Sequence, residues 1–264
     1  MVYFCVKIVT TIHLLKGAAH LKSYQTLLFD VDDTLLDFKA AENYALQKLF
    51  SEHNVVLTDD IKQFYQEMNQ KLWSSFEKGE LEREELLHTR FSILFKKIGL
   101  TLDGVHLDNL YREYLEESAV LIDGATSLLQ KLAKQYDLYV VTNGVARTQF
   151  IRLNNSNLST YFKDIFVSEE IGYQKPMKEF FNHVFEKIPH CSADKTLIIG
   201  DSLTSDIQGG INAGIDTCWF NPKGPINTTL LPTYEINRLQ TLENLLLTPN
   251  SPVETPNTHS VLTF

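Results

Sequence analysis

Three short segments of the chain are rich in apolar residues, and each one leads into residues that can do chemistry. The segments are residues 27–29, 138–141 and 196–199. The residues that follow them are Asp30, Thr142 and, after one glycine, Asp201. Short apolar strands separated by helical stretches are typical of a parallel α/β sheet, in which ligands bind at the carboxyl ends of the strands. The sequence therefore predicts a doubly wound parallel sheet with these polar residues gathered in one crevice.

The residues that follow the first apolar segment are unusually acidic. Residues 30–34 (Asp-Val-Asp-Asp-Thr) place three carboxylates within four positions. Carboxylates this close resist ionising beside one another unless a cation lies among them, and Mg²⁺ is the usual cation for hard oxygen ligands. Taken alone, the segment fits an acidic surface turn, with Asp33 and Thr34 capping a helix, equally well. The other polar strand ends favour the magnesium site.

Asp30 and Asp32 have the spacing of a nucleophile and its acid/base partner. Asp30, the first residue after the strand, can attack a phosphoryl group and form an aspartyl-phosphate that water then hydrolyses. Asp32 can protonate the leaving oxygen and then deprotonate the attacking water. Lys175 completes the predicted catalytic set, because its positive charge offsets the carboxylates.

The same carboxylates are the predicted metal ligands. Mg²⁺ would bridge Asp30 and the phosphate, with Asp201 as a second carboxylate ligand and the main-chain carbonyl of Asp32 as a third. Asp206, five residues beyond Asp201, is grouped with the metal site and is expected to orient a metal-bound water or Lys175.

The second strand end supplies hydrogen-bond donors for the phosphate. Thr142, Asn143 and Gly144 lie at a predicted strand-to-helix turn. The hydroxyl of Thr142 and the amide groups of Asn143 and Gly144 can donate to phosphate oxygens, and Lys175 adds the remaining positive charge.

In this order the polar segments resemble the four motifs of the haloacid dehalogenase-like (HAD) phosphohydrolases. The matching positions are residues 30–34, Thr142, Lys175, and residues 200–202 with Asp206. The resemblance covers about residues 24–246 and implies a Rossmann-like core and a Mg²⁺-dependent phosphomonoesterase. Members that cleave carbon–halogen bonds lack the acid/base carboxylate found here at Asp32, so the resemblance implies phosphoryl transfer.

Residues 38–120 are predicted to form an all-helical cap. Apolar residues recur there at helical spacing, for example over residues 45–50, 61–72 and 91–98. An insertion between the first two strand ends would lie over the crevice, and its closing would exclude water and select the substrate. The catalytic core is then discontinuous and consists of residues 23–37 and 121–247.

Three aromatic residues of the cap are candidates for contacting the substrate. Trp73 and Phe76 could stack on a nucleobase, and Phe38 could reach the leaving group. Packing in the interior of a small helical domain is the alternative for each of them. Arginines 83, 90 and 147 could also contact a substrate, although solvated helix faces are the commoner place for such residues.

A closer resemblance concerns the substrate. Residues 30–38, 69–73, 142–144, 166–169, 174–176 and 218–222 are similar to the bacterial pyrimidine 5′-nucleotidases that act on non-standard nucleotides. The resemblance implies a 5′-nucleotidase that dephosphorylates pyrimidine nucleoside monophosphates, including non-standard ones.

Other functions fit the same core. One alternative is a phosphatase for sugar phosphates or phosphoglycolate, and another is a phosphomutase, which would need several basic cap residues at the site. A non-catalytic phosphate or nucleotide sensor is disfavoured, because a sensor has no need of the pair formed by Asp30 and Asp32.

Composition narrows the partners. The 264 residues carry a net charge of −9, which disfavours binding to a nucleic acid polymer but not to a small phosphorylated metabolite. The three cysteines are scattered without metal-ligand spacing, which favours reduced thiols in a cytoplasmic protein. The apolar stretch at residues 6–15 is too short to span a bilayer, so no membrane association is expected.

The two ends of the chain fit the enzyme poorly. Residues 1–22 are expected to be a dispensable extension, with natural translation starting near Leu21. Residues 248–264 are rich in Pro, Ser, Thr and Asn and are expected to form a disordered tail.

Overall fold

The computed structural model describes residues 23–224 and 226–247, so the expectations for residues 1–22 and 248–264 lie outside the described part. Its described strands are β1 (Thr26–Phe29), β2 (Asp137–Thr142), β3 (Asp164–Val167), β4 (Thr196–Gly200), β5 (Asp216–Phe220) and β6 (Tyr234–Ile236). They form one parallel sheet in the order β3-β2-β1-β4-β5-β6. The predicted α/β fold with a parallel sheet is confirmed.

The order of the strands reverses at β1. The chain builds outward from β1 through β2 to β3 and then returns to place β4 on the other side of β1. Phe29, the last residue of β1, pairs with Val140 on one side and Ile199 on the other. In open parallel sheets such a switch point opens a crevice at the carboxyl ends of the strands. Asp30 therefore begins where a ligand site is expected.

Helices cover both faces of the sheet. The helices of this core are α5 (Ala125–Leu132), α6 (Ala146–Asn155), α7 (Ser168–Ile171), α8 (Lys178–Lys187), α9 (Gln208–Ala213) and α10 (Leu239–Leu247). Side chains alternate along β1, so Leu27 and Phe29 pack in one hydrophobic cluster with α5 and α10, whereas Leu28 packs in another with α8. Burial on both faces explains why the strands read as continuous apolar runs.

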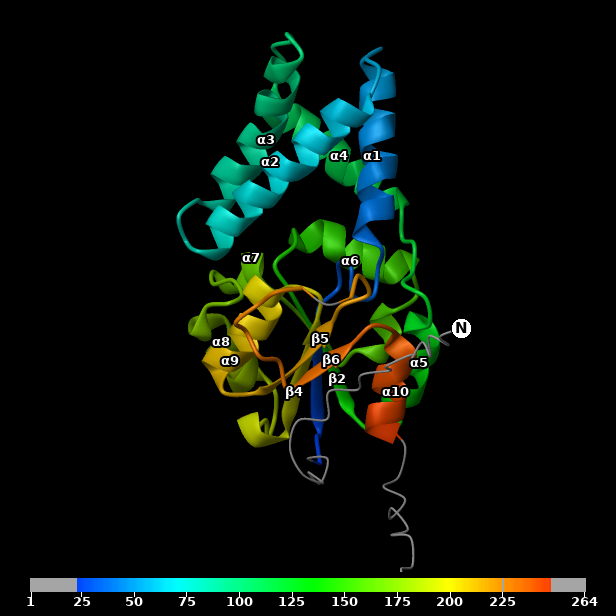
Figure 1. Ribbon diagram of the computed structural model, residues 1–264, viewed down its shortest axis with the longest axis vertical. Coiled ribbons are helices and arrows are strands. Elements are labelled where there is room, and N and C mark those ends of the chain that lie inside the picture. The colour runs from blue at the N-terminus through cyan, green and yellow to red at the C-terminus, as the bar shows by residue number, and fades with distance from the viewer. Residues whose placement is uncertain (1–22, 225, 248–264) are drawn as a thin grey trace, which may run out of the picture.

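Four further helices form the predicted cap. They are α1 (Phe38–Glu52), α2 (Asp59–Glu77), α3 (Arg83–Lys97) and α4 (Gly104–Glu117), and they stand over the end of the sheet near α6 and α7 (Figure 1). Their apolar faces share a core of their own, in which the ring of Tyr65 stacks on that of Phe91 at 5.4 Å between centroids. Asp37, Thr58 and Asp103 begin α1, α2 and α4 by accepting hydrogen bonds from first-turn amides.

The two chain crossings between core and cap lie side by side. The amide of Asp37 donates to the main-chain oxygen of Val120 at 2.8 Å, and the amide of Ile122 donates to that of Leu35 at 2.9 Å. Within the described ranges no helix has the length and apolar character needed to cross a membrane.

Candidate active site

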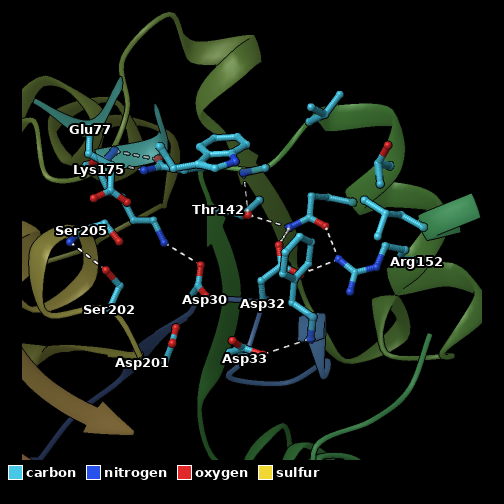
Figure 2. A pocket seen from close by; sticks show the side chains of 18 of the residues that line it. Asp30, Asp32, Asp33, Glu77, Thr142, Arg152, Lys175, Asp201, Ser202 and Ser205 are labelled. Atoms are coloured by element: carbon cyan, nitrogen blue, oxygen red, sulfur yellow. Dashed lines mark hydrogen bonds and ion pairs between the residues drawn. The ribbon is translucent and has the colours of Figure 1, made fainter. Parts of the chain in front are cut away.

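Lys175 lies at the centre of the polar residues that follow the strands. Its Nζ donates to Asp30 Oδ1 at 2.7 Å, to Asp206 Oδ1 at 2.6 Å and to the main-chain oxygen of Val141 at 2.8 Å. An ammonium group has three protons, so every donor of this buried side chain is used. Figure 2 shows Lys175 beside Asp30, on the side of the pocket away from Arg152. The structure thus brings together residues 145 positions apart in the sequence.

Three carboxylates meet beside this lysine. One oxygen of each of Asp30, Asp201 and Asp206 lies within 4.8 Å of the others. Asp206 belongs to a π-helical turn, Leu203–Ile207, and its Oδ2 accepts from the amide of Ser202 at 3.0 Å. Gly200 leaves room for this carboxylate, because a Cβ at that position would lie 2.1 Å from Asp206 Oδ2.

The charges of this cluster are unbalanced. Burial, helped by the charges of Asp206 and Asp32, raises the pKa of Asp30 to about 8 despite the opposing effect of Lys175. Burial and the charge of Asp30 likewise raise the pKa of Asp201. Burial opposes the charge of Lys175, but Asp206 and Asp30 raise its pKa above the ordinary value. One ammonium cannot offset three ionised carboxylates, and a divalent cation such as Mg²⁺, which prefers hard oxygen donors, would supply the missing positive charge.

Asp32 is held from the other side of the crevice. Its Oδ1 pairs with Arg152 Nη1, and its Oδ2 accepts from Gln149 Nε2 at 2.9 Å. Both partners lie on α6, as Figure 2 shows for Arg152. Asp33 does different work, because its Oδ1 accepts from the amide of Phe38 at 3.1 Å at the start of α1. Asp33 thus supports the start of α1 beside the N-cap Asp37, as the capping alternative expected, but the capping expected of Thr34 is wrong, because its buried Oγ1 has no hydrogen-bond partner among the described residues.

The turn after β2 is tightly hydrogen-bonded. Thr142 Oγ1 accepts from the amide of Gly144 at 3.1 Å and from Gln149 Nε2 at 2.8 Å. The side chain of Asn143 exchanges hydrogen bonds with the backbone of Lys175, at 2.8 and 2.9 Å. In this arrangement the Gly144 amide, expected to face a phosphate, donates to Thr142 instead.

Residues of the core and the cap together line an open cavity of about 320 Å³. On the core side its walls include Asp30, Asp32, Thr142, Lys175 and Asp201. The cap contributes Phe38, Trp73, Glu77, Arg90, Arg112 and Leu115. Two of the three aromatic candidates, Phe38 and Trp73, therefore line the cavity.

Phe76 is only 5% exposed and packs with Leu86 and Leu87, with its ring edge-on to Trp73 at 5.7 Å. Phe76 therefore packs in the interior of the cap, which was the alternative to contacting the substrate.

The three candidate arginines, two in the cap and one on α6 of the core, lie in different surroundings. Arg83 hydrogen-bonds to core residues of the site, and Arg90 is buried with its Nε donating to Asp108 Oδ1 at 2.7 Å. Arg147 has a side chain 68% exposed and lies 3.4 Å from Glu116, as expected for a solvated helix face. Solvent exposure was the commoner expectation for all three and is wrong for Arg83 and Arg90, because each found polar partners distant in sequence.

Sequence reasoning missed Gln149, Arg152 and Arg112. The first two lie three residues apart, one helical turn after the polar end of β2, so they share a face of α6. That spacing was the available signal. For Arg112 the sequence holds no such signal. Its partner Asp108 lies four residues earlier on the same helix, α4, which is also the spacing of an ordinary surface ion pair.

Comparison with known proteins places the chain among hydrolases. Residues 27–220 match the model of the haloacid dehalogenase-like hydrolase family. The chain is 55% identical to YfnB of Bacillus subtilis, a protein named as a HAD-hydrolase without a substrate, over 88% of this chain and 99% of YfnB. A crystal structure of YfnB bound to magnesium superimposes with a TM-score of 0.82 at 56% identity, covering 85% of this chain and 99% of that one.

Two further relatives carry substrate names. Pyrimidine 5′-nucleotidase PynA of Streptococcus pneumoniae is 45% identical over 84% of this chain and 95% of its own. Pyrimidine 5′-nucleotidase YjjG of Escherichia coli is 32% identical over 83% of this chain and 96% of its own.

Proposed function

Because this chain belongs to the haloacid dehalogenase-like hydrolases, we propose that it is a magnesium-dependent phosphomonoesterase whose substrates are pyrimidine nucleoside 5′-monophosphates, including non-standard ones. One observation supports phosphatase activity most directly. Asp30, Lys175 and Asp201 lie together, and Asp32 lies beside them in contact with other residues. The names of PynA and YjjG, two relatives matched over nearly their whole lengths, support the nucleotide.

The first half of the reaction uses Asp30 and Asp32. A carboxylate oxygen of Asp30 attacks phosphorus, and the bond from phosphorus to the ester oxygen breaks, leaving an aspartyl-phosphate. Asp32 delivers a proton to the departing oxygen, so that an alcohol rather than an alkoxide leaves. Lys175 holds Asp30 through Oδ1, which leaves Oδ2 for the attack.

The second half returns the enzyme to its starting state. Asp32, now deprotonated, takes a proton from a water molecule that attacks the phosphorus of the aspartyl-phosphate. The bond from phosphorus to Asp30 breaks, inorganic phosphate leaves, and Asp32 is again protonated for the next turnover. Thr142 and Lys175 lie beside the reacting group and contribute a hydroxyl donor and a positive charge.

Magnesium fits the acidic side of the site. The carboxylates of Asp30 and Asp201 and the main-chain carbonyl of Asp32 would hold it. Bound there, the ion supplies positive charge to the phosphoryl oxygens. Asp206 has one oxygen on Lys175 and the other on the amide of Ser202, so it serves the site by fixing Lys175 and the turn that follows Asp201.

The cap side of the cavity supports a nucleoside as the leaving group. The rings of Phe38 and Trp73 offer apolar faces to a base, and Arg90 and Arg112 offer donors to its carbonyl oxygens. A screen tests this assignment by comparing kcat/KM for UMP, TMP, CMP and 5-halogenated UMP with kcat/KM for hexose phosphates, phosphoglycolate and glyceraldehyde 3-phosphate. We expect a pyrimidine nucleotide to exceed every sugar phosphate, with the Asp30→Asn protein as background. A hexose phosphate that outperforms all the nucleotides contradicts the nucleotidase.

A phosphomutase is the second candidate, because Arg90 and Arg112 are basic cap residues at the cavity. Both pair with Asp108, which offsets part of their charge and leaves less for a second phosphate group. Incubation with hexose phosphates and a trace of bisphosphate distinguishes the two activities. A mutase interconverts the isomers, whereas the phosphatase releases inorganic phosphate.

A further inference from the structure

Helix α6 holds both carboxylate oxygens of Asp32. We propose that Gln149 and Arg152 are positioning residues that hold Asp32 for proton transfer to the leaving oxygen. The inference rests on the proposed phosphomonoesterase function and deepens it, because it assigns a role to two residues that touch no reacting atom.

The contacts form a closed network. Arg152 Nη1 pairs with Asp32 Oδ1 and also donates to Gln149 Oε1 at 3.1 Å, while Gln149 Nε2 donates to Asp32 Oδ2 at 2.9 Å. Gln149 and Arg152 are each 1% exposed, whereas the side chain of Asp32 is 31% exposed and lines the cavity. Two fixed groups thus hold a carboxylate that still reaches the substrate side.

The burial of Arg152 is costly, which argues for a function. Its Nε and Nη2 are buried without a hydrogen-bond partner among the residues that the structure describes. Leaving donors of a charged group unpaired away from water destabilises a fold, and the face of Phe38, 5.6 Å from the guanidinium, offsets this only in part. An apolar residue would fill the space at lower cost. What it could not do is orient Asp32.

Gln149 extends the same hold to the phosphate side. Its Nε2 also donates to Thr142 Oγ1 at 2.8 Å, and the amide of Gly144 donates to that oxygen at 3.1 Å. A hydroxyl has two acceptor lone pairs and one proton, so these two bonds leave the proton of Thr142 for a further acceptor. A phosphate oxygen in the cavity is such an acceptor. The side chain of Gln149 therefore fixes the position of the Asp32 carboxyl relative to the Thr142 hydroxyl.

Leaving-group dependence tests the inference, because a merely structural role would not show it. p-Nitrophenyl phosphate has a good leaving group that needs little protonation, whereas phenyl phosphate has nearly the same shape and a poorer one. The rate of phenol release in the first turnover reports the step in which Asp32 acts as an acid. General acid catalysis contributes about 10²–10⁴-fold. We expect Arg152→Met to slow the first turnover of phenyl phosphate by about 10- to 100-fold and that of p-nitrophenyl phosphate by less than about threefold. Gln149→Met, which also releases Thr142, should slow both compounds, but phenyl phosphate by about tenfold more than p-nitrophenyl phosphate.

Three controls make the outcome decisive. Arg147→Met, an exposed arginine of the same helix, should leave both rates unchanged. Arg152→Lys should recover part of the phenyl phosphate rate, and it carries the test together with Gln149→Met should Arg152→Met fail to fold. Adding Arg152→Met to Asp32→Asn should cost little more than Asp32→Asn alone, because the two residues act as one unit.

Equal losses on the two aryl phosphates, or fully additive losses in the double variant, would overturn the inference. Failure of the proposed function looks different, because the unaltered protein would then turn over neither compound, and the inference would fall with it.

Discussion

The guanidinium of Arg83, at the start of α3, donates a hydrogen bond of 2.9 Å to the main-chain oxygen of Asn143, in the turn after β2. The same group also donates to the oxygen of Gly144 at 3.3 Å and to Ser168 Oγ. A residue of the cap thereby hydrogen-bonds to the turn that is proposed to bind phosphate. Gly79, with a φ of 72°, makes the sharp turn between α2 and α3 that brings Arg83 there.

Two other bonds fasten the same hairpin to the core. Gln174 Nε2 donates to the main-chain oxygen of Phe76 at 2.7 Å, and Thr204 Oγ1 donates to Glu77 Oε2 at 2.9 Å. Both core residues adjoin the site, since they lie next to Lys175 and near Asp201. The hairpin between α2 and α3 is therefore hydrogen-bonded to the core segments that carry Asn143, Lys175 and Asp201.

Replacing Arg83 should weaken substrate binding. Arg83→Met removes charge-assisted hydrogen bonds between the cap and the turn after β2, so this arrangement of cap over core becomes less favourable and KM for a nucleotide should rise by about tenfold. Steady-state kinetics measure the change. Lys78→Met, at an exposed position in the same hairpin, is the control. An unchanged KM in the Arg83 variant would show that this arrangement does not depend on this residue.

Asp30→Asn should abolish turnover of p-nitrophenyl phosphate, because an amide cannot form the aspartyl-phosphate. The loss should exceed about 10³-fold, while the circular dichroism spectrum stays that of the unaltered protein. Lys175 keeps Asp206 as its counter-ion in this variant, so the site should remain folded. Substantial residual activity in the purified variant would remove Asp30 from the role of nucleophile.

Magnesium should stabilise the protein as well as activate it. A ligand at 100 times its Kd adds about 2.7 kcal/mol to the free energy of unfolding, which for a chain of this size raises Tm by about 5–10 °C. Thermal unfolding with and without MgCl₂ measures this shift, and EDTA should abolish activity. Asp201→Asn should reduce both effects. Full activity after exhaustive chelation would rule out the metal-dependent mechanism.

Trp73 and Phe76 should respond differently to truncation. Trp73→Ala removes a ring that lines the cavity, and stacking on a base contributes about 1–3 kcal/mol, so kcat/KM for a nucleotide should fall by about tenfold while that for p-nitrophenyl phosphate changes little. Phe76→Ala opens a hole in a packed cluster and should instead lower the free energy of unfolding by about 3–5 kcal/mol. Equal losses on both substrates for Trp73→Ala would favour a packing role for this residue too.

The sequence by itself determined the three central strands of the sheet and their polar ends, but not β3, β5 and β6. The strand segments at residues 27–29, 138–141 and 196–199 match β1, β2 and β4, because strands buried on both faces must be apolar throughout. Helical spacing over residues 38–120 likewise predicted the cap helices. These signals depend only on neighbouring residues, so they can be recognised in one sequence without its structure.

Only the tertiary structure decided how the side chains of the site are held. Asp32 meets Gln149 and Arg152 across 117 and 120 residues, and Arg83 meets Asn143 across 60. The spacing of Gln149 and Arg152 marks a shared face of α6 but not its partner, because a polar residue on a helix has the same sequence pattern whether it faces water or a carboxylate of the site. Burial and hydrogen-bond geometry separate these two cases, and both arise only when α6 and the cap pack against the end of the sheet.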